Sequence, residues 1–410
     1  MVNIRKLLEK VNKKYGGSED APLVFLSSES PILNVPRLKT GIFSLDLALG
    51  GGIPQGRVIR IFGPFSAGKT WSCLKIVRNN QHLCRSCWGT YLKDKKKKKC
   101  CATPEKFKTL WLDIEGVWEN KWAVTQGVNL DQLYISRTEF AEQALDIAHA
   151  CMAEQAFDLV ILDSLAALSS MKEMDSSQED TKVAVNARVL NEFMRKAVSD
   201  INKRKDTDHK TTLILINQVR YTISSYGDPE VLPGGRGQEF AASVDVRMER
   251  KKILTDKGSY VGPGADNSKT GLPVGALTSF RVPKNKTAPP NRTGEFTVWF
   301  DNHPAMEKKV GDIDCSEAVF EYGLRCGVIF KKKKEYMATD SDDKLMPLGT
   351  KKEIVQELLF HDTVLSSVIE SAIITRLTQG DDDVREPAGE DTERVEPDGS
   401  GGDDGIISSV

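Results

Sequence analysis

No run of apolar residues in this 410-residue chain approaches the roughly 18 that a membrane-spanning helix needs. The amino-terminal sequence MVNIRKLLEKVNKKYGG also lacks the apolar segment of a secretory signal, because Leu7 and Leu8 stand among lysines. We therefore expect an intracellular, soluble protein with no membrane partner. The apolar share of 40% is ordinary for a globular protein and leaves room for a large domain with appendages or for two or three smaller domains.

Net charge is nearly absent too, at −1, but the two signs are unevenly distributed. Residues 381–404 contain eleven acidic residues and two arginines, so this stretch carries −9 and the rest of the chain +8. Its Pro, Gly, Asp and Glu content cannot bury enough apolar surface to offset the entropy of ordering, which predicts a disordered tail. Such a tail is either a solvated chain end or a competitor of an anionic polymer for the basic body.

The chain does contain a glycine-rich loop, GPFSAGKT at residues 63–70, which fits the pattern G-x-x-x-x-G-K-[ST]. The preceding RVIRIF predicts a strand, and the apolar spacing after the loop predicts a helix over residues 69–77. In that context, glycines let backbone N–H groups approach phosphate oxygens beside a helix N-terminus. Lys69 would meet the β and γ phosphates and Thr70 a Mg²⁺ ion, although the pattern alone also occurs by chance.

Polar side chains also end three further segments that predict buried strands. Asp163 ends FDLVILD and can hold Mg²⁺ through water, as a nucleotidase with this loop requires. Glu115 in TLWLDIEG is our candidate for the base that activates the attacking water, the alternative being a surface acid. Gln218 ends TLILINQ, where a neutral amide could sense the γ-phosphate.

Taken in order, GPFSAGKT, LWLDIEG, FDLVILDSLAAL, TLILINQVR, PGG and VPKNK closely resemble the motifs of the RecA-type recombinases of bacteria and phages. The likeness runs from about residue 11 to about residue 376 and includes TGIFSLDLALGGGIPQGR before the glycine-rich loop. It implies an α/β fold with a RecA-like P-loop ATPase core, in which a mostly parallel twisted sheet is flanked by helices. It also implies an N-terminal polymerisation arm, a small α+β C-terminal lobe, and a place in the cytoplasm of a bacterial cell or phage-infected host.

The resemblance assigns the nucleotide site residue by residue. It places the catalytic glutamate at Glu115, the metal-site aspartate at Asp163, the γ-phosphate sensor at Gln218 and the adenine-stacking aromatic at Trp122. Lys284 and Lys286 of VPKNK match a pair that reaches the ATP of a neighbouring subunit, which makes them catalytic candidates together with Lys69. The residues expected to bind ATP and Mg²⁺ are Gly63, Pro64, Phe65, Ser66, Ala67, Gly68, Lys69, Thr70, Trp71, Trp122 and Asp163, with the metal on Thr70 and Asp163.

The resemblance also implies DNA contacts from two loops, near residues 171–183 and 220–233, and from the helix NARVLNEFMRKA. The expected DNA-binding residues are Arg188, Arg195, Arg220, Ile223, Gly234, Gly235 and Arg236. Arg188 and Arg195 are seven residues apart and so share one helix face, which without the resemblance would more often be plain surface. The second loop is shorter by about one residue than in typical relatives, and Arg236 replaces a usual asparagine.

The function implied is an ATP-dependent recombinase that forms filaments on single-stranded DNA and exchanges strands with homologous double-stranded DNA. Single-strand-binding and mediator proteins are further partners of such an enzyme. The alternatives are a branch-migration or helicase motor of the same fold, or a DNA-coating scaffold with little turnover.

We divide the chain at positions that the resemblance suggests. Residues 1–36 would form the helix-and-strand oligomerisation arm, although its amphipathic helix could instead cap its own core. Residues 37–312 would form the ATPase core, 313–376 the small C-terminal lobe, and 377–410 the acidic tail.

A cysteine-rich insert at residues 81–107 has no counterpart in that family. Cys84 and Cys87 form a C-x-x-C knuckle, Cys100 and Cys101 follow after twelve residues, and His82 precedes the first cysteine by two. In a reducing compartment, clustered thiols predict a Zn²⁺ site with four Cys or three Cys and one His, rather than disulfides. Adjacent cysteines do not easily ligate together, so which of His82, Cys100 and Cys101 complete the site stays open, as do free thiols and redox control.

Lys95 to Lys99 lie between the two cysteine pairs. This run predicts a surface that binds DNA phosphate or the acidic surface of a partner. The alternative is a solvated hairpin tip. The remaining cysteines are predicted to be packing residues, namely Cys73, Cys151, Cys315 and Cys326.

Overall fold

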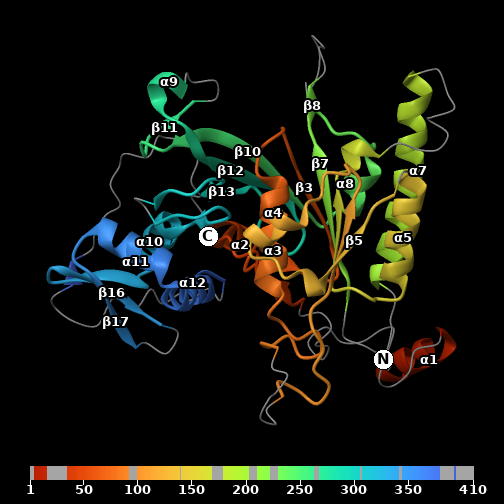
Figure 1. Cartoon of the computed structure of the whole chain (residues 1–410). Helices are drawn as coiled ribbons and strands as arrows, with labels where there is room; N and C mark the ends of the chain where they lie inside the picture. The colour runs from red at the N-terminus through yellow and green to blue at the C-terminus, as the bar shows by residue number, and fades with distance from the viewer. Residues whose placement is uncertain are drawn as a thin grey trace.

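The computed structural model describes residues 4–15, 35–91, 99–138, 140–168, 179–202, 210–221, 230–262, 267–304, 307–340, 344–378 and 392–393. Among them a ten-stranded sheet forms the centre of the molecule, and six of its strands run parallel (Figure 1). In spatial order these are β10 (Val244–Thr255), β3 (Val58–Gly63), β7 (Thr212–Gln218), β6 (Leu159–Asp163), β4 (Thr109–Asp113) and β5 (Leu133–Ser136). The predicted α/β class and mostly parallel sheet are therefore confirmed.

Antiparallel strands extend the sheet beyond β10. They are β12 (Pro273–Asn285), β13 (Arg292–Trp299) and β14 (Ile313–Asp314), while β11 (Tyr260–Val261) pairs with β10 alone. Residues 244–247 of β10 pair with β3, which leads into the glycine-rich loop, and β12 pairs with the other side of β10. The extension therefore lies one strand away from β3.

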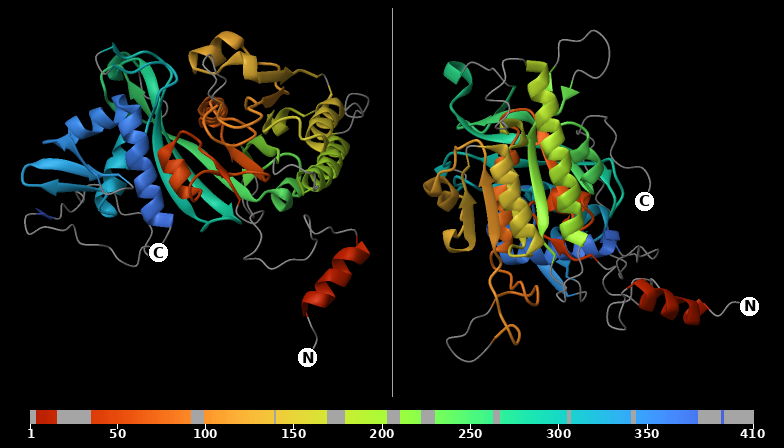
Figure 2. Two further views of the ribbon diagram at one scale, coloured as in Figure 1. Left: turned by 90° about the horizontal axis from the view of Figure 1, so that it is seen from below. Right: turned by 90° about the vertical axis from the view of Figure 1, so that its right-hand side faces the viewer.

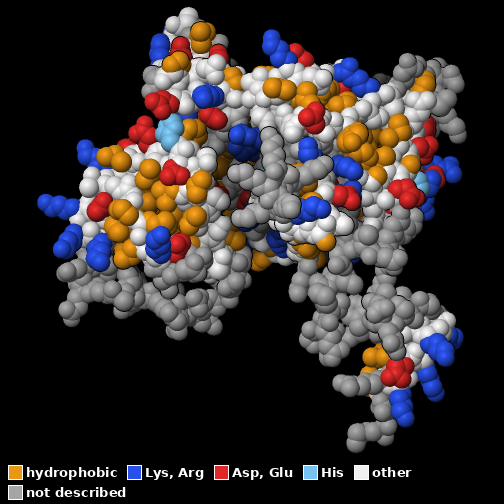
Figure 3. Space-filling model, turned by 60° about the horizontal axis from the view of Figure 1, so that its bottom comes forward, with side chains coloured by type: hydrophobic (Ala, Val, Ile, Leu, Met, Phe, Trp, Pro, Cys, Tyr) orange, Lys and Arg blue, Asp and Glu red, His pale blue; other side chains and the backbone are white. Residues whose placement is uncertain are grey.

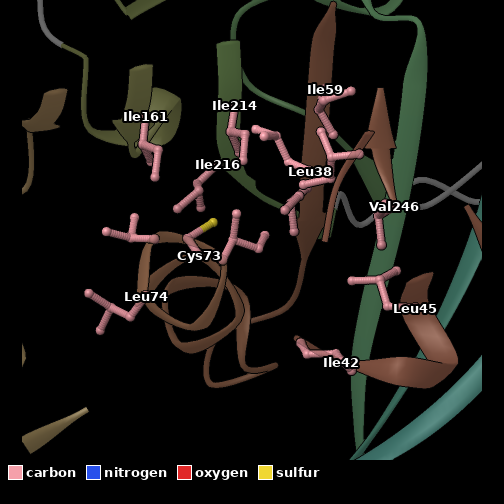
Figure 4. Packing of buried hydrophobic residues seen from close by; sticks show 14 of the residues in the cluster. Leu38, Ile42, Leu45, Ile59, Cys73, Leu74, Ile161, Ile214, Ile216 and Val246 are labelled. Atoms are coloured by element: carbon pink, nitrogen blue, oxygen red, sulfur yellow. The ribbon is translucent and has the colours of Figure 1, made fainter. Parts of the chain in front are cut away.

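Helices cover both faces of the parallel part because its strands are apolar on both sides. Along β7, Ile214 and Ile216 face α3 (Lys69–Asn80), whereas Leu213 and Leu215 belong to a second buried cluster under α5 (Ala141–Ala153) and α7 (Glu179–Asn202). This alternation has the period of two expected for a strand. Figure 4 shows Cys73 of α3 pointing into the first cluster, in agreement with its prediction as a packing residue.

Short elements connect these strands and helices. They are β1 (Arg37–Leu38), α2 (Phe43–Ala48), β2 (Ile53–Pro54), α4 (Asn120–Thr125), η3 (Leu130–Gln132), η4 (Leu165–Ala167), β8 (Arg220–Tyr221), β9 (Glu230–Val231), α8 (Gly237–Ala241) and α9 (Asn267–Thr270). The amino-terminal helix α1 (Ile4–Tyr15) stands apart from the sheet in Figure 2, and its Ile4 and Leu7 are 67% and 49% exposed. The strand predicted after it lies outside the described residues.

The carboxy-terminal elements build a smaller α+β unit. They are α10 (Ser316–Arg325), β15 (Ile329–Lys332), β16 (Glu335–Thr339), β17 (Leu345–Gly349), α11 (Lys352–His361), α12 (Thr363–Thr378) and β18 (Thr392–Glu393). Their apolar side chains form one cluster with Phe43 and Leu47 of α2, which attaches this unit to the core. Of the predicted acidic tail the structure describes residues 377 and 378, which end α12, and β18, which pairs with Lys331 and Lys332 of β15. The predicted disorder stays a prediction for the rest.

No single helix among the described residues has the length and hydropathy to cross a membrane. The pair α11 and α12 reaches both together but is bent by 105° at the break. Apolar residues of these two helices, Ile354, Val364 and Val368, are exposed. Figure 3 shows hydrophobic side chains gathered over this unit, with lysine and arginine side chains at its margin.

A cavity of about 370 Å³ lies where α12 meets the core, and it contains two carboxyl groups, Asp46 and Glu370. Burial, with Asp46 as a further cause, raises the pKa of Glu370 to about 7, and burial raises the pKa of Asp46 to about 6. The folded chain therefore keeps protons on these groups that the unfolded chain has released, so stability falls as pH rises from about 4.5 to 7.

We expect Glu370→Gln to raise the free energy of unfolding by about 1 to 3 kcal/mol at pH 8, with the gain shrinking toward pH 5. The amide keeps the oxygen that accepts from Ser366 (3.0 Å) and removes the charge that is costly to bury. Chemical denaturation across this pH range measures the effect, and Glu357→Gln at an exposed position of α11 is the matched control. A gain that did not depend on pH would contradict the assignment.

Candidate functional site

The glycine-rich loop joins the end of β3 to the start of α3, as predicted. Its glycines are required: a Cβ on Gly63 would lie 2.0 Å from the carbonyl oxygen of Met248, and Gly68 at the start of α3 has φ of 84°. The N-terminus of α3 consequently opens directly onto the loop. Unpaired backbone N–H groups at such a place attract an anion.

Lys69 folds back over this loop. Its ammonium group donates to the carbonyl oxygens of Gly63 (2.9 Å) and Pro64 (2.6 Å). Burial lowers the pKa of Lys69, although Asp163 and Glu115 act in the opposite direction. A phosphate in the loop would add a negative charge in direct reach of this ammonium group, whose hydrogen bonds to Gly63 and Pro64 go to uncharged carbonyl oxygens.

Thr70 and Asp163 meet at the ends of α3 and β6. The Thr70 hydroxyl donates to a carboxylate oxygen of Asp163 at 3.1 Å. Burial raises the pKa of Asp163 to about 7, with Glu115 and Asp113 adding negative charge nearby. A cation bound to this oxygen-rich site would stabilise the ionised carboxylate, so the donor set fits Mg²⁺.

Glu115 lies on the neighbouring strand end and receives two hydrogen bonds. Ser164 donates from its hydroxyl (2.5 Å) and Gln218 from its amide nitrogen (2.7 Å), both to the same carboxylate oxygen. These contacts follow from the strand order β7, β6, β4, which aligns three carboxyl ends. Sequence reasoning had named Glu115 and Gln218 but missed Ser164, whose only signal was its place directly after Asp163.

Asp113 fixes the loop that carries Glu115. It is buried and accepts hydrogen bonds from the backbone N–H groups of Val117 (3.1 Å) and Trp118 (3.0 Å). Arg137, which follows β5, donates to it as well at 2.9 Å. Glu115 therefore projects from a loop that is tied to two strands.

An apolar pocket of about 310 Å³ adjoins the glycine-rich loop. Trp71 and Trp122 pack edge to face in its wall, with ring centroids 5.1 Å apart. The other lining residues are Ser66, Gly68, Arg250, Ala276, Thr278, Val298 and Phe300. Sequence reasoning missed the members beyond residue 249, because they lie in β10, in β12 ahead of the VPKNK motif, and at the end of β13, where no motif marks them.

Lys284 and Lys286 lie at the end of β12, away from this pocket's lining. Lys284 donates to the carbonyl oxygen of Glu239 in α8 at 2.5 Å, and burial together with Lys286 lowers its pKa. Lys286 is exposed. Within one chain, Lys284 therefore contacts α8, and Lys286 points into solvent.

Of the predicted DNA-binding residues, Arg188 and Arg195 are exposed on α7. Gly234 and Gly235 form a turn with φ of 91° and 72°, and Arg236 is exposed beside it. Arg220 starts β8 and contacts the carbonyl oxygen of Ala166 (3.4 Å). Ile223 and most of both predicted loops lie outside the described residues.

The four insert cysteines converge. The Sγ atoms of Cys84, Cys87, Cys100 and Cys101 all lie within 4.8 Å of one another, and those of Cys84 and Cys101 are 3.8 Å apart. Cys100 and Cys101 share a bend in the chain, so adjacency does not prevent both from joining the cluster. His82 is exposed and lines the cavity beside α12 instead.

The insert follows the end of α3 and precedes β4, so it lies where the parallel strands begin (Figure 1). The glycine-rich loop lies where these strands end. Arg85 donates to the carbonyl oxygen of Gln155 (2.9 Å) and pairs with the buried carboxylate of Asp158 (3.4 Å), just before β6. Trp88 packs on Phe107 with centroids 6.4 Å apart. The thiol cluster thus lies near the starts of β4 and β6, whereas Glu115 and Asp163 lie at the opposite ends of these two strands.

Comparisons with known proteins show which proteins this chain resembles. The sequence model of a family described as the RecA N-terminal domain matches residues 2–91 and 100–303. The chain is similar to Protein RecA of Campylobacter hominis, with 30% identity over 399 residues covering 95% of this chain and 99% of that protein. It is also similar to Protein RecA of Campylobacter jejuni subsp. doylei (33% over 330 residues, 78% and 84%) and of Sulfurimonas denitrificans (30% over 382 residues, 92% and 95%).

Proposed function

This chain belongs to the RecA family of ATP-dependent DNA recombinases, and on that premise we propose which of its residues carry the activity. The protein is a DNA-dependent ATPase of recombination and repair that catalyses strand exchange, and its family uses ATP and Mg²⁺ and forms filaments on DNA. A branch-migration or helicase motor is not favoured, because the likeness to recombinases covers 84% to 99% of the relatives' lengths.

The contact that carries the catalytic proposal is the double hydrogen bond to Glu115. With ATP phosphates on the loop and Lys69 beside them, Glu115 accepts a proton from the attacking water while Ser164 and Gln218 hold its carboxylate. Thr70 and Asp163 would hold Mg²⁺, which would supply positive charge beside the phosphate oxygens.

The pocket beside the loop fits the adenine ring. Trp122 offers the stacking face that the family resemblance assigns to it, and Trp71 fixes its position by edge-to-face packing. Lys284 and Lys286 would act on a neighbouring protomer's ATP as charge stabilisers, and α1 would dock on that neighbour.

DNA would bind along α7 and the turn next to it. Arg188, Arg195 and Arg236 are exposed cations that can meet phosphates, and Gly234 and Gly235 allow the backbone to approach closely. Such contacts accept any sequence, as strand exchange requires. We further assign the protein to the cytoplasm, with single-strand-binding and mediator proteins as partners.

We assign the four-cysteine cluster to Zn²⁺. A tetrahedral ion with Zn–S bonds of about 2.3 Å requires sulfur atoms about 3.8 Å apart, and Cys84 and Cys101 have this separation. The predicted contact of the lysine run with DNA or an acidic partner falls on residues 95–98, which are outside the described part, and on the exposed Lys99.

ATP hydrolysis measured against added single-stranded DNA, with electron microscopy of the same mixtures, tests the proposed function. We expect stimulation accompanied by helical filaments. Stimulation with rings would favour a helicase motor, and filaments without turnover would favour a scaffold and contradict the role of Glu115.

A further inference from the structure

Two buried amide side chains lie between the nucleotide site and the DNA-facing turn. Asn217 precedes the sensor Gln218 at the end of β7, and Gln238 lies in the first turn of α8. Both are fully buried, and the Asn217 amide nitrogen donates to the Gln238 side-chain oxygen at 3.0 Å. Buried amides are costly unless their hydrogen bonds are made, so the position of each is strongly determined.

On one side this pair is joined to the catalytic glutamate. The side-chain oxygen of Asn217 accepts from the backbone N–H of Gln218 (2.8 Å), and the Gln218 side chain donates to Glu115. A change in the position of Gln218 when the γ-phosphate is lost would therefore act directly on Asn217.

On the other side the pair holds the turn that carries the predicted DNA contacts. Asn217 and Gln238 both donate to the carbonyl oxygen of Pro233, at 2.9 and 2.6 Å, and Gln238 also donates to that of Gly235 at 3.2 Å. Each of the four amide N–H bonds thus has an acceptor, and exchanging oxygen for nitrogen in either side chain would place donors against donors.

This turn also packs against α7, the helix that carries Arg188 and Arg195. A Cβ on Gly234 would approach Leu190 to 2.5 Å, and one on Gly237 would approach the side-chain oxygen of Asn191 to 1.7 Å. The backbone of the turn consequently lies close on α7, and the two cannot move independently by much.

We propose that Asn217 and Gln238 are positioning residues that couple the nucleotide state sensed at Gln218 to the placement of the Gly234–Arg236 turn and α7 for DNA. The proposal rests on the function proposed above and adds the physical link between its two sites. The coupling must be reciprocal: DNA bound at the turn favours the hydrolytic arrangement of Gln218 and Glu115, and ATP favours DNA binding.

Gln238→Met tests this link, because methionine has a similar length and volume but makes none of the three hydrogen bonds. We expect hydrolysis without DNA and the KM for ATP to stay within about twofold, and stimulation by single-stranded DNA to fall at least about tenfold. The ratio of DNA dissociation constants with ADP and with a non-hydrolysable ATP analogue should shrink similarly.

Gln132→Met is the matched control. Gln132 is also buried and donates to two carbonyl oxygens, those of Gln81 (2.8 Å) and Phe107 (2.9 Å), but it lies in η3, away from both sites. A loss of stability common to both variants would appear in thermal denaturation without changing the stimulation by DNA in the control. If the two residues act as a unit, Asn217→Leu combined with Gln238→Met lowers stimulation no further than either change alone.

Normal stimulation and a normal ratio of dissociation constants in Gln238→Met would overturn the coupling while leaving the recombinase assignment intact. A wild-type protein that shows no stimulation by DNA would overturn the proposed function and the coupling with it. Should Gln238→Met fail to fold, Asn217→Ser keeps a hydroxyl near the Gln218 N–H and gives the same two readouts.

Discussion

Glu115→Gln is expected to lower kcat for ATP hydrolysis by about two to four orders of magnitude. The amide keeps the size of the side chain and an oxygen that can accept from Ser164 and Gln218, so the site stays assembled. It lacks the basicity to take a proton from water. ATP therefore stays bound in an intact site, and single-stranded DNA should dissociate more slowly because the ATP state persists.

Steady-state hydrolysis and DNA dissociation, measured on the same preparations, check this expectation. Lys69→Ala serves as the comparison, because the loss of the cation beside the phosphates should abolish both turnover and retention of DNA. Glu115→Gln should lower turnover alone, so the two variants together distinguish ATP binding from ATP hydrolysis. Glu353→Gln, at an exposed position of α11, is the control for a charge change. Hydrolysis by Glu115→Gln at the wild-type rate would show that another group activates the water.

The nucleotide site at the carboxyl ends of the parallel strands could be predicted from the sequence, because its residues follow strands with strong local patterns. The predicted strands before Gly63, Glu115, Asp163 and Gln218 correspond to β3, β4, β6 and β7, whose parallel pairing aligns their carboxyl ends. Periodicity and a shared edge are enough to bring such residues together.

The rest of the site depends on contacts that no local pattern encodes. Arg250 reaches the pocket from β10, and Thr278 and Phe300 reach it from the antiparallel extension. None of the three belongs to a sequence motif. Gln238 looks like an ordinary polar residue after PGG, and only tertiary burial gives its amide a role. Tertiary packing, unlike period or propensity, cannot be derived from one sequence.

The insert lies between these cases. Cysteine spacing predicted a metal site, and the three-dimensional cluster contains all four thiols but not His82. The expectation that the adjacent Cys100 and Cys101 do not easily join one site assumed a regular knuckle. The chain has a bend at these residues, and both thiols lie in the cluster. Spacing rules capture pairs separated by a short turn better than ligands joined by a long loop.

The double variant Cys84→Ser and Cys87→Ser should abolish metal binding by the purified protein. We expect one zinc ion per wild-type chain, none in the variant, and a loss of stability on the order of 3 kcal/mol. The loss is smaller than for an isolated zinc finger because Arg85 and Trp88 still attach the insert to the core. Elemental analysis and chemical denaturation measure both quantities.

Hydrolysis should respond differently from stability in this variant. The cluster lies at the opposite end of the strands from Glu115, so we expect kcat without DNA to change by less than about twofold where the protein is folded. Cys151→Ser with Cys326→Ser, which removes two thiols outside the cluster, is the matched control for oxidation and handling. A metal content near zero in wild type and variant alike would refute the zinc site and leave four free thiols, which oxidise to disulfides far more readily than thiols bound to zinc because only the free thiolate attacks.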